Sequence, residues 1–203
     1  MLENKTEISV EALRAGDREE FSRLVDAYSG AIYRLAIKML GVSTDAEDVL
    51  QNTFLKAFQH LKDFEGRSSL STWLYRIAAN EALMLLRKSR PEINFSDAAS
   101  NEDENENKDY FPAQFTDWCC LPEAELLSNE SKSALDQAVQ HLPETQRIVF
   151  ILRDIEGLSI RETSQVLNLS EAAVKTRLLR ARLSLREELS TYYGERLNKR
   201  SKL

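Results

Sequence analysis

The strongest constraint on the fold is an acidic segment in the middle of the chain, because it cannot form part of a packed core. Residues 92–130 hold 11 acidic side chains against one basic side chain, Lys108, and little apolar content before Tyr110. Strong charge of one sign with low hydrophobicity cannot offset the entropy of ordering the chain. We therefore expect an acidic flexible linker at residues 92–121, between one domain of residues 1–91 and another of residues 122–203.

The formal charge of −6 on 203 residues would argue against a nucleic-acid partner, but the charge is unevenly distributed along the chain. Residues 1–91 are neutral, residues 92–130 carry −10, and residues 147–203 hold 12 basic against 7 acidic side chains. The acidity therefore belongs to the linker, and a basic C-terminal region remains available for phosphate contacts.

Both flanking domains show the pattern of long helices, since the chain has only 6 glycines and 4 prolines. Apolar side chains recur at helical spacing from Val10 to Met39, and Gly41 ends that run. Thr44 and Glu47 form a predicted capping box for the next helix. That helix is expected to bury Phe54 and Phe58, and a fourth helix, at about residues 71–87, is expected to bury its apolar residues, Trp73 and Met84 among them.

Helices are also predicted for residues 123–142, from Glu144 after Pro143, and twice more after Gly157. No strand alternation is found, so the predicted class is all-α. In the last pair of helices, Ser159 with Glu162 and then Ser170 are the predicted N-terminal caps.

This last pair has the layout of a helix-turn-helix, whose second helix enters the major groove of DNA. Four residues lie on its predicted buried side: Val174, Leu178, Ala181 and Leu185. Four basic residues are expected to neutralise phosphates: Lys175, Arg177, Arg180 and Arg182. Near the helix start, Glu171, Lys175 and Thr176 are placed to meet base edges. The alternative is an ordinary amphipathic hairpin with a solvated basic face.

Three motifs resemble a known family. Residues 45–58 (DAEDVLQNTFLKAF) resemble the core-polymerase-binding helix of bacterial sigma factors, and residues 64–78 (FEGRSSLSTWLYRIA) resemble the promoter-melting loop and helix. Residues 142–147 (LPETQR) and the helix-turn-helix resemble region four. Because no third domain lies between them, the chain resembles the extracytoplasmic-function (ECF) subgroup of the sigma-70 superfamily. The resemblance implies a region 2-like domain followed by a region 4-like domain.

The resemblance also implies three sets of site residues. On an exposed stripe beside a buried Phe54, it implies a core-polymerase-binding surface of Asp48, Gln51, Asn52, Phe54 and Lys56. For the minus-ten promoter element, where a base is flipped out of the non-template strand, it implies Phe64, Arg67, Ser68, Ser69, Arg76, Asn80, Arg87 and Lys88. For the minus-35 element, it implies Ser170, Glu171, Lys175, Thr176, Arg177 and Arg180. The alternatives are solvated helix faces and, for Trp73, a plain core tryptophan, which its spacing with Ile77 favours.

The implied function is that of a dissociable transcription initiation factor acting in transcription regulation and stress response. Its implied partners are RNA polymerase core, through the largest-subunit coiled coil and the flap, promoter DNA, and an inhibitory anti-sigma factor, commonly tethered to the membrane. The linker would thread the polymerase, where its carboxylates would either mimic nucleic acid or serve only as a spacer.

Two other functions compete with this one. A stand-alone helix-turn-helix regulator would use residues 1–91 for sensing or dimerisation. An enzyme is not predicted, because no nucleophile–base set or phosphate loop occurs. No cofactor or metal is expected, since His60 and His141 offer no ligand spacing and the adjacent Cys119 and Cys120 are better explained as idle thiols. With no export signal or membrane-spanning run, the expected location is the cytoplasm.

Overall fold

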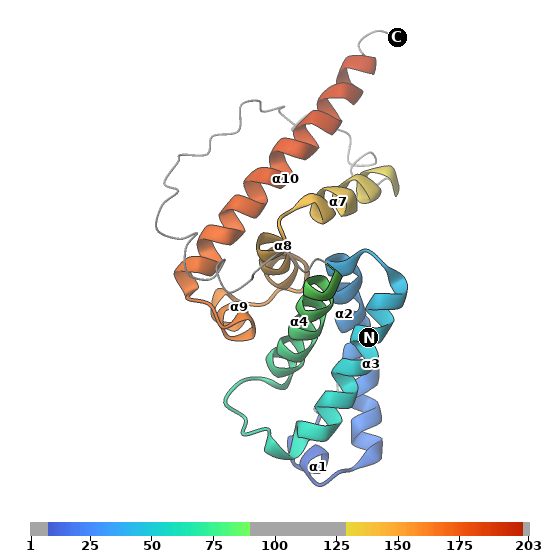
Figure 1. The fold of residues 1–203 in the computed structure, drawn as a ribbon, viewed down its shortest axis with the longest axis vertical. Coiled ribbons are helices and arrows are strands. Elements are labelled where there is room, and N and C mark those ends of the chain that lie inside the picture. Colours follow the sequence, from blue (N-terminus) through green and yellow to red (C-terminus); the bar gives the residue numbers. More distant parts are fainter. Residues whose placement is uncertain (1–7, 90–128, 201–203) are drawn as a thin grey trace, which may run out of the picture. The chain divides into compact units, whose positions relative to one another are not determined.

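The computed structural model describes residues 8–89 and 129–200, and every regular element in these ranges is helical (Figure 1). The all-α prediction is therefore confirmed for the described part of the chain. The described residues group into two units, one of residues 8–89 with 162–168 and one of residues 129–161 with 169–200. The predicted linker at 92–121 and the Cys119–Cys120 pair lie outside the described residues.

The first unit is built from three long helices, α2 (Arg18–Leu40), α3 (Ser43–His60) and α4 (Leu70–Ser89), each of which packs on the other two. A short helix α1 (Val10–Arg14) precedes them, and a 3-10 turn η1 (Leu61–Asp63) follows α3. The side chains at the centre have no exposed area: Leu24, Ile32, Leu35, Met39, Val49 and Leu74. Each such burial contributes about 1.5–3 kcal/mol, so this core holds the helices in place.

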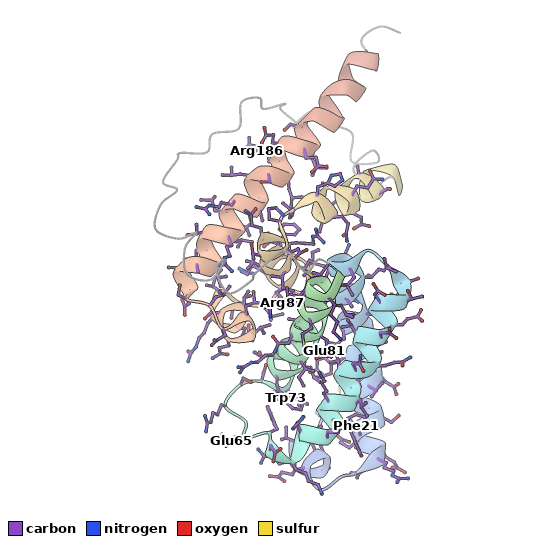
Figure 2. All side chains as sticks on the ribbon, in the orientation of Figure 1. Phe21, Glu65, Trp73, Glu81, Arg87 and Arg186 are labelled. Atoms are coloured by element: carbon purple, nitrogen blue, oxygen red, sulfur yellow. The ribbon has the colours of Figure 1, made fainter. Side chains whose placement is uncertain are left out.

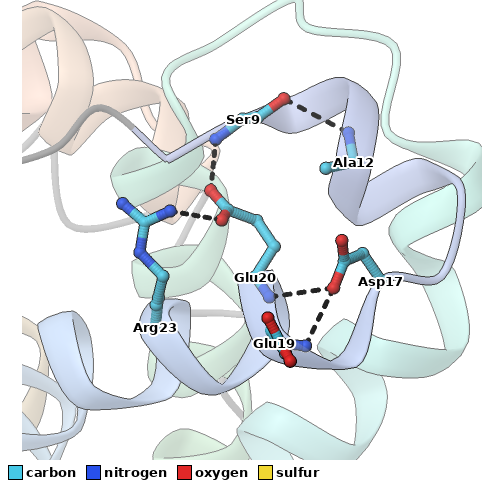
Figure 3. A network of polar contacts seen from close by, with 6 residues as sticks. All are labelled: Ser9, Ala12, Asp17, Glu19, Glu20 and Arg23. Carbon is cyan, nitrogen blue, oxygen red and sulfur yellow. Dashed lines mark hydrogen bonds and ion pairs between the residues drawn. The ribbon is translucent and has the colours of Figure 1, made fainter.

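The first apolar run forms two helices, α1 and α2, and a polar network links their first turns (Figure 3). The Asp17 carboxylate accepts hydrogen bonds from the backbone N–H groups of Glu19 (2.9 Å) and Glu20 (3.2 Å), which caps α2. The carboxylate of Glu20, only 7% exposed, accepts from the Ser9 N–H at 2.6 Å and pairs with Arg23 at 2.5 Å. These contacts fix the start of α1 against the start of α2.

The boundary between α2 and α3 confirms one prediction and corrects another. Gly41 ends α2 with φ of 74° and its N–H donates to the Ile37 carbonyl at 2.8 Å, as its predicted stop role requires. The capping box at Thr44 and Glu47 is wrong, because α3 already begins at Ser43. Its N-cap is Val42, whose side chain makes no capping bond.

Two side chains predicted to be buried are exposed. Phe58 is 51% exposed because only part of its ring packs, edge to face, on Phe21 at 5.1 Å between centroids. Met84 is 46% exposed, since it lies about 200° around α4 from the buried Ala82. Both were predicted to be buried because their side chains are apolar.

The second unit contains α7 (Asn129–His141), α8 (Glu144–Phe150), the π-helical turn η2 (Ile151–Ile155) and α10 (Glu171–Arg200), and α10 packs on both α7 and α8. Pro143 stands immediately before α8, as predicted. Four residues predicted to share the buried side of α10 are all buried: Val174, Leu178, Ala181 and Leu185. Helix α9 (Ile160–Leu167) precedes α10 in the chain.

A buried arginine joins the end of α7 to α8. The Arg147 guanidinium donates to Gln140 Oε1 at 3.2 Å, to the Gln140 carbonyl, and to the Leu142 carbonyl at 2.9 Å. Carbonyls at a helix C-terminus have no partner within the helix, so a buried donor stabilises this end strongly.

Candidate functional site

An exposed stripe on α3 carries three of the predicted polymerase-binding residues. Asp48, Gln51 and Asn52 are all exposed, and their spacing of three and four residues places them on one face. Leu55 continues this face and is 55% exposed. Sequence reasoning missed Leu55; its position seven residues after Asp48 was the available signal. Leu55 and Phe58 add apolar surface at the end of a polar stripe, a combination typical of protein-binding surfaces.

The other two predicted members of this surface are already engaged within the unit. Phe54 is 8% exposed and packs edge to face on Phe21 at 6.5 Å between centroids, so its predicted burial is confirmed. Lys56 is half-buried, and its Nζ pairs with Glu81 Oε1 of α4 at 2.5 Å. The α3 stripe is therefore defined here as Asp48, Gln51, Asn52 and Leu55.

The loop between η1 and α4, residues 64–69, has a buried first residue and an exposed middle. Phe64 is 6% exposed, and its ring lies 5.2 Å from the Trp73 ring (centroid to centroid). Phe64 is one of the predicted minus-ten residues, but its burial leaves little of its ring exposed to a base. Arg67 lies in the exposed part of the loop and pairs with Glu65 at 2.5 Å.

The serines at the end of this loop form a hydroxyl network that caps α4. Ser69 Oγ accepts from the Thr72 N–H at 3.1 Å and lies 2.7 Å from Thr72 Oγ1 and 2.9 Å from Ser71 Oγ. Ser68 Oγ donates to the Ser69 carbonyl at 3.4 Å. Ser69 therefore holds the loop's shape, while Arg67 is exposed in the middle of the loop, where its side chain is accessible to a ligand.

Helix α4 continues from this loop with polar side chains on its outer face. Arg76, Asn80 and Arg87 are exposed, and spacings of four and seven residues place them on one side of the helix; Lys88 is exposed beside them. Trp73 is half-buried rather than a fully buried core residue, and Figure 2 shows it at the start of α4, near the loop that carries Glu65. A cationic strip with an amide in its middle can bind a nucleic-acid backbone and a base edge.

The predicted recognition helix begins as expected. Asn168 adopts a left-handed conformation with φ of 54°, and Ser170 Oγ accepts from the Ala173 N–H at 3.1 Å, confirming the predicted cap. Glu171, Lys175 and Thr176 are exposed on the first turns of α10, and Arg180 is half-exposed. Leu179, 59% exposed, was not predicted.

Two of the predicted phosphate-binding arginines are not free on that face. Arg177 is only 7% exposed, so the prediction that it lies on the exposed basic face is wrong; it shares the helix side of the buried Val174 and Ala181. Arg182 makes a two-pronged ion pair with Asp154, with Nε to Oδ2 at 2.8 Å and Nη2 to Oδ1 at 2.7 Å. The hydrogen bonds to Asp154 raise the pKa of Arg182 above its ordinary value.

Within residues 8–89 and 129–200 no group of three His, Cys, Asp or Glu side chains is placed to hold a metal ion. No helix in the same ranges is long and apolar enough to span a bilayer.

Comparison with known proteins matches both halves of the chain to one family. The family model for sigma-70 region 2 matches residues 24–92, and the model for sigma-70 region 4 matches residues 132–185. The ECF RNA polymerase sigma factor SigW of Bacillus subtilis is 34% identical over 180 residues, covering 89% of this chain and 94% of SigW. The chain is an ECF sigma factor.

Other relatives agree with this assignment. The RNA polymerase sigma-H factor of Pseudomonas aeruginosa is 33% identical over 191 residues, covering 92% of this sigma factor and 94% of the relative. The sigma factor RpoE of Bartonella quintana, solved in complex with the anti-sigma factor NepR, superimposes with a TM-score of 0.61 at 26% identity, covering 84% of this chain and 97% of that one. The resemblance inferred from three motifs is thus confirmed over most of the chain.

Proposed function

We propose that this sigma factor binds core RNA polymerase, recognises the minus-35 and minus-ten promoter elements, and promotes melting without catalysing a reaction of its own. The observation that carries the proposal is the presence of both sigma-70 regions, in order, on one chain. The proposed domains are residues 1–91 and 122–203 with the linker 92–121 between them, and the site of action is the cytoplasm, where core polymerase works.

The α3 stripe is the proposed contact with the polymerase coiled coil. Asp48, Gln51 and Asn52 are exposed, and the adjoining Leu55 leaves more than half of its surface in water. Covering an apolar side chain while hydrogen-bonding its polar neighbours is how a protein partner would use such a face.

The loop 64–69 and the outer face of α4 are the proposed minus-ten contacts, and the start of α10 is the proposed minus-35 contact. Arg67, Arg76 and Asn80 support the first proposal, because their exposed cationic and amide groups suit a single strand. Lys175 and Thr176 support the second, since they occupy the exposed first turns of α10. Because the Bartonella quintana relative is bound by an anti-sigma factor, we propose such an inhibitory partner here too.

Run-off transcription with core polymerase, with and without this chain, tests the proposal. We expect promoter-specific transcripts only when the chain is present, and weak binding of duplex DNA by the chain alone. Tight duplex binding by the chain alone, without any transcript, would instead support the stand-alone regulator.

Asp48→Arg tests the α3 stripe in the same assay. The position is exposed, so we expect core binding to fall sharply while the circular dichroism spectrum is unchanged. Asp26→Arg is the matched control, because it makes the same charge change at an exposed position of α2. An equal loss of core binding in Asp48→Arg and Asp26→Arg would show that the change in net charge, and not the α3 stripe, causes the effect.

A further inference from the structure

Arg14, at the end of α1, contacts the loop 64–69 although 50 residues separate it from Phe64. Its Nη2 donates to the Phe64 carbonyl, and its guanidinium carbon lies 5.9 Å from the centroid of the Phe64 ring. The same Nη2 is 4.0 Å from where a Cβ on Gly66 would lie. One side chain thus touches both the backbone and the ring at the start of the loop, a hydrogen bond combined with a cation–π contact.

The loop is fixed at its other end as well. Ser69 Oγ, at that end, accepts from the Thr72 N–H at 3.1 Å. At the start of the loop, the Phe64 ring also meets the Trp73 ring, with 5.2 Å between the centroids. Gly66 has φ of 74°, a left-handed conformation that glycine adopts without strain. The exposed residues between these anchors are therefore held in a defined turn rather than being free to sample many shapes.

From these contacts we propose that Arg14 is a positioning residue for the loop that receives the flipped minus-ten base. The inference rests on the proposed function of that loop. A loop already held in its binding shape loses less conformational entropy when a nucleotide enters, so it binds more tightly and discriminates better between bases. Arg14 acts through Phe64 and need not touch the DNA.

The test compares the full chain with Arg14→Met and Arg14→Lys, each assembled with core polymerase. The probe is a pool of single-stranded DNA 12-mers randomised at its six central positions, sequenced after retention by the holoenzyme. For Arg14→Met we expect base preference to fall about tenfold at one position, as loss of a charge-assisted hydrogen bond predicts, with the other positions unchanged. Arg14→Lys should restore part of it, because an ammonium still donates to the Phe64 carbonyl. Arg18→Met, an exposed arginine at the start of α2, is the control and should match the wild type.

Amide hydrogen exchange in the full chain supplies a direct second measurement. Arg14→Met should speed exchange at Gly66 and Arg67 while leaving the α2–α4 core protected and core-polymerase affinity unchanged. Faster exchange throughout the unit with lost core binding would overturn the proposal and make Arg14 a general stabilising residue.

Two further results would also overturn the positioning role. In Arg14→Met, binding could instead weaken equally at every DNA position, while the slope of log affinity against log salt becomes shallower by about 0.7. That result would mean that Arg14 contacts a phosphate directly. No base preference in the wild-type holoenzyme would refute the proposed function of the loop itself, and the positioning role with it. The two failures are distinguishable because the second is seen without any substitution.

Discussion

Removing the Lys56 charge should destabilise the first unit, because it leaves the Glu81 carboxylate without its partner. The Glu81 side chain is 12% exposed and Lys56 is 43% exposed, with 2.5 Å between Nζ and Oε1. Exposed ion pairs contribute up to about 1 kcal/mol, whereas breaking a fully buried pair costs about 3–5 kcal/mol. This pair lies between those limits and nearer the exposed one, so Lys56→Met should cost about 1–2 kcal/mol, roughly 5–10 °C in Tm for a unit of this size.

The assay is urea unfolding followed by the fluorescence of Trp73, in a Trp118→Phe background that leaves one tryptophan. The double variant Lys56→Met with Glu81→Leu should recover most of the stability, because neither charge is then left unpaired. A Lys56→Met variant within about 0.3 kcal/mol of the wild type would refute the reasoning, since the carboxylate would then be adequately solvated without its partner.

The same double variant separates two roles for Lys56. If Lys56 contacts polymerase directly, as the family resemblance implies, the double variant should regain stability without regaining core binding. If Lys56 serves only to neutralise Glu81, the double variant should regain stability and core binding together. The core binding of the double variant is compared with that of the single variants Lys56→Met and Glu81→Leu.

Three further predictions concern the second unit. Asp154→Ala should release Arg182 and steepen the logarithmic salt dependence of DNA binding by about 0.9, and adding Arg182→Met should cancel this effect. The raised pKa of Arg182 keeps its side chain charged, and the stabilisation from its ion pair is lost only as pH rises through that pKa. The salt dependence of the wild type should therefore not change between about pH 7 and 9. Arg147→Met should lower the free energy of unfolding by about 2–3 kcal/mol, because the carbonyls of Gln140 and Leu142 lose the donor that Arg147 provides. A thermal unfolding curve equal to that of the wild type would contradict this role of Arg147. Ser170→Ala should cost about 1 kcal/mol through loss of the α10 cap, with Ser170→Asp retaining it; a loss of equal size in both variants would exclude capping as the cause.

The helices and their buried faces were largely predictable, because a helical face is a local property. Val174, Leu178, Ala181 and Leu185 share a side through their spacing alone, and all four are buried. Gly41, Pro143 and Ser170 also act where expected, since each works through the backbone next to it. The exposed positions of Asp48, Gln51 and Asn52 followed from the same periodicity.

Errors arose where a local pattern allowed two outcomes. Thr44 was predicted to cap α3, but the N-cap is Val42, two residues earlier, because the helical backbone already begins at Ser43. Phe58 lies at the margin of the apolar face of α3, whereas Met84 lies on the far side of α4 from the buried Ala82; both were predicted to be buried because their side chains are apolar. Arg177 is charged, so its residue type favoured the surface, although its spacing from Val174 and Ala181 places it on the buried side that it occupies.

The sequence by itself determined the all-α class, the separation of two helical regions by an acidic segment, and the motifs that assign the chain to the ECF sigma factors. Only the tertiary structure decided which polar side chains are already committed within the fold. Lys56 meets Glu81 across 25 residues, Asp154 meets Arg182 across 28, and Arg14 meets Phe64 across 50. Periodicity sets the direction of a side chain from its own helix, but its partner depends on how helices distant in the sequence pack together.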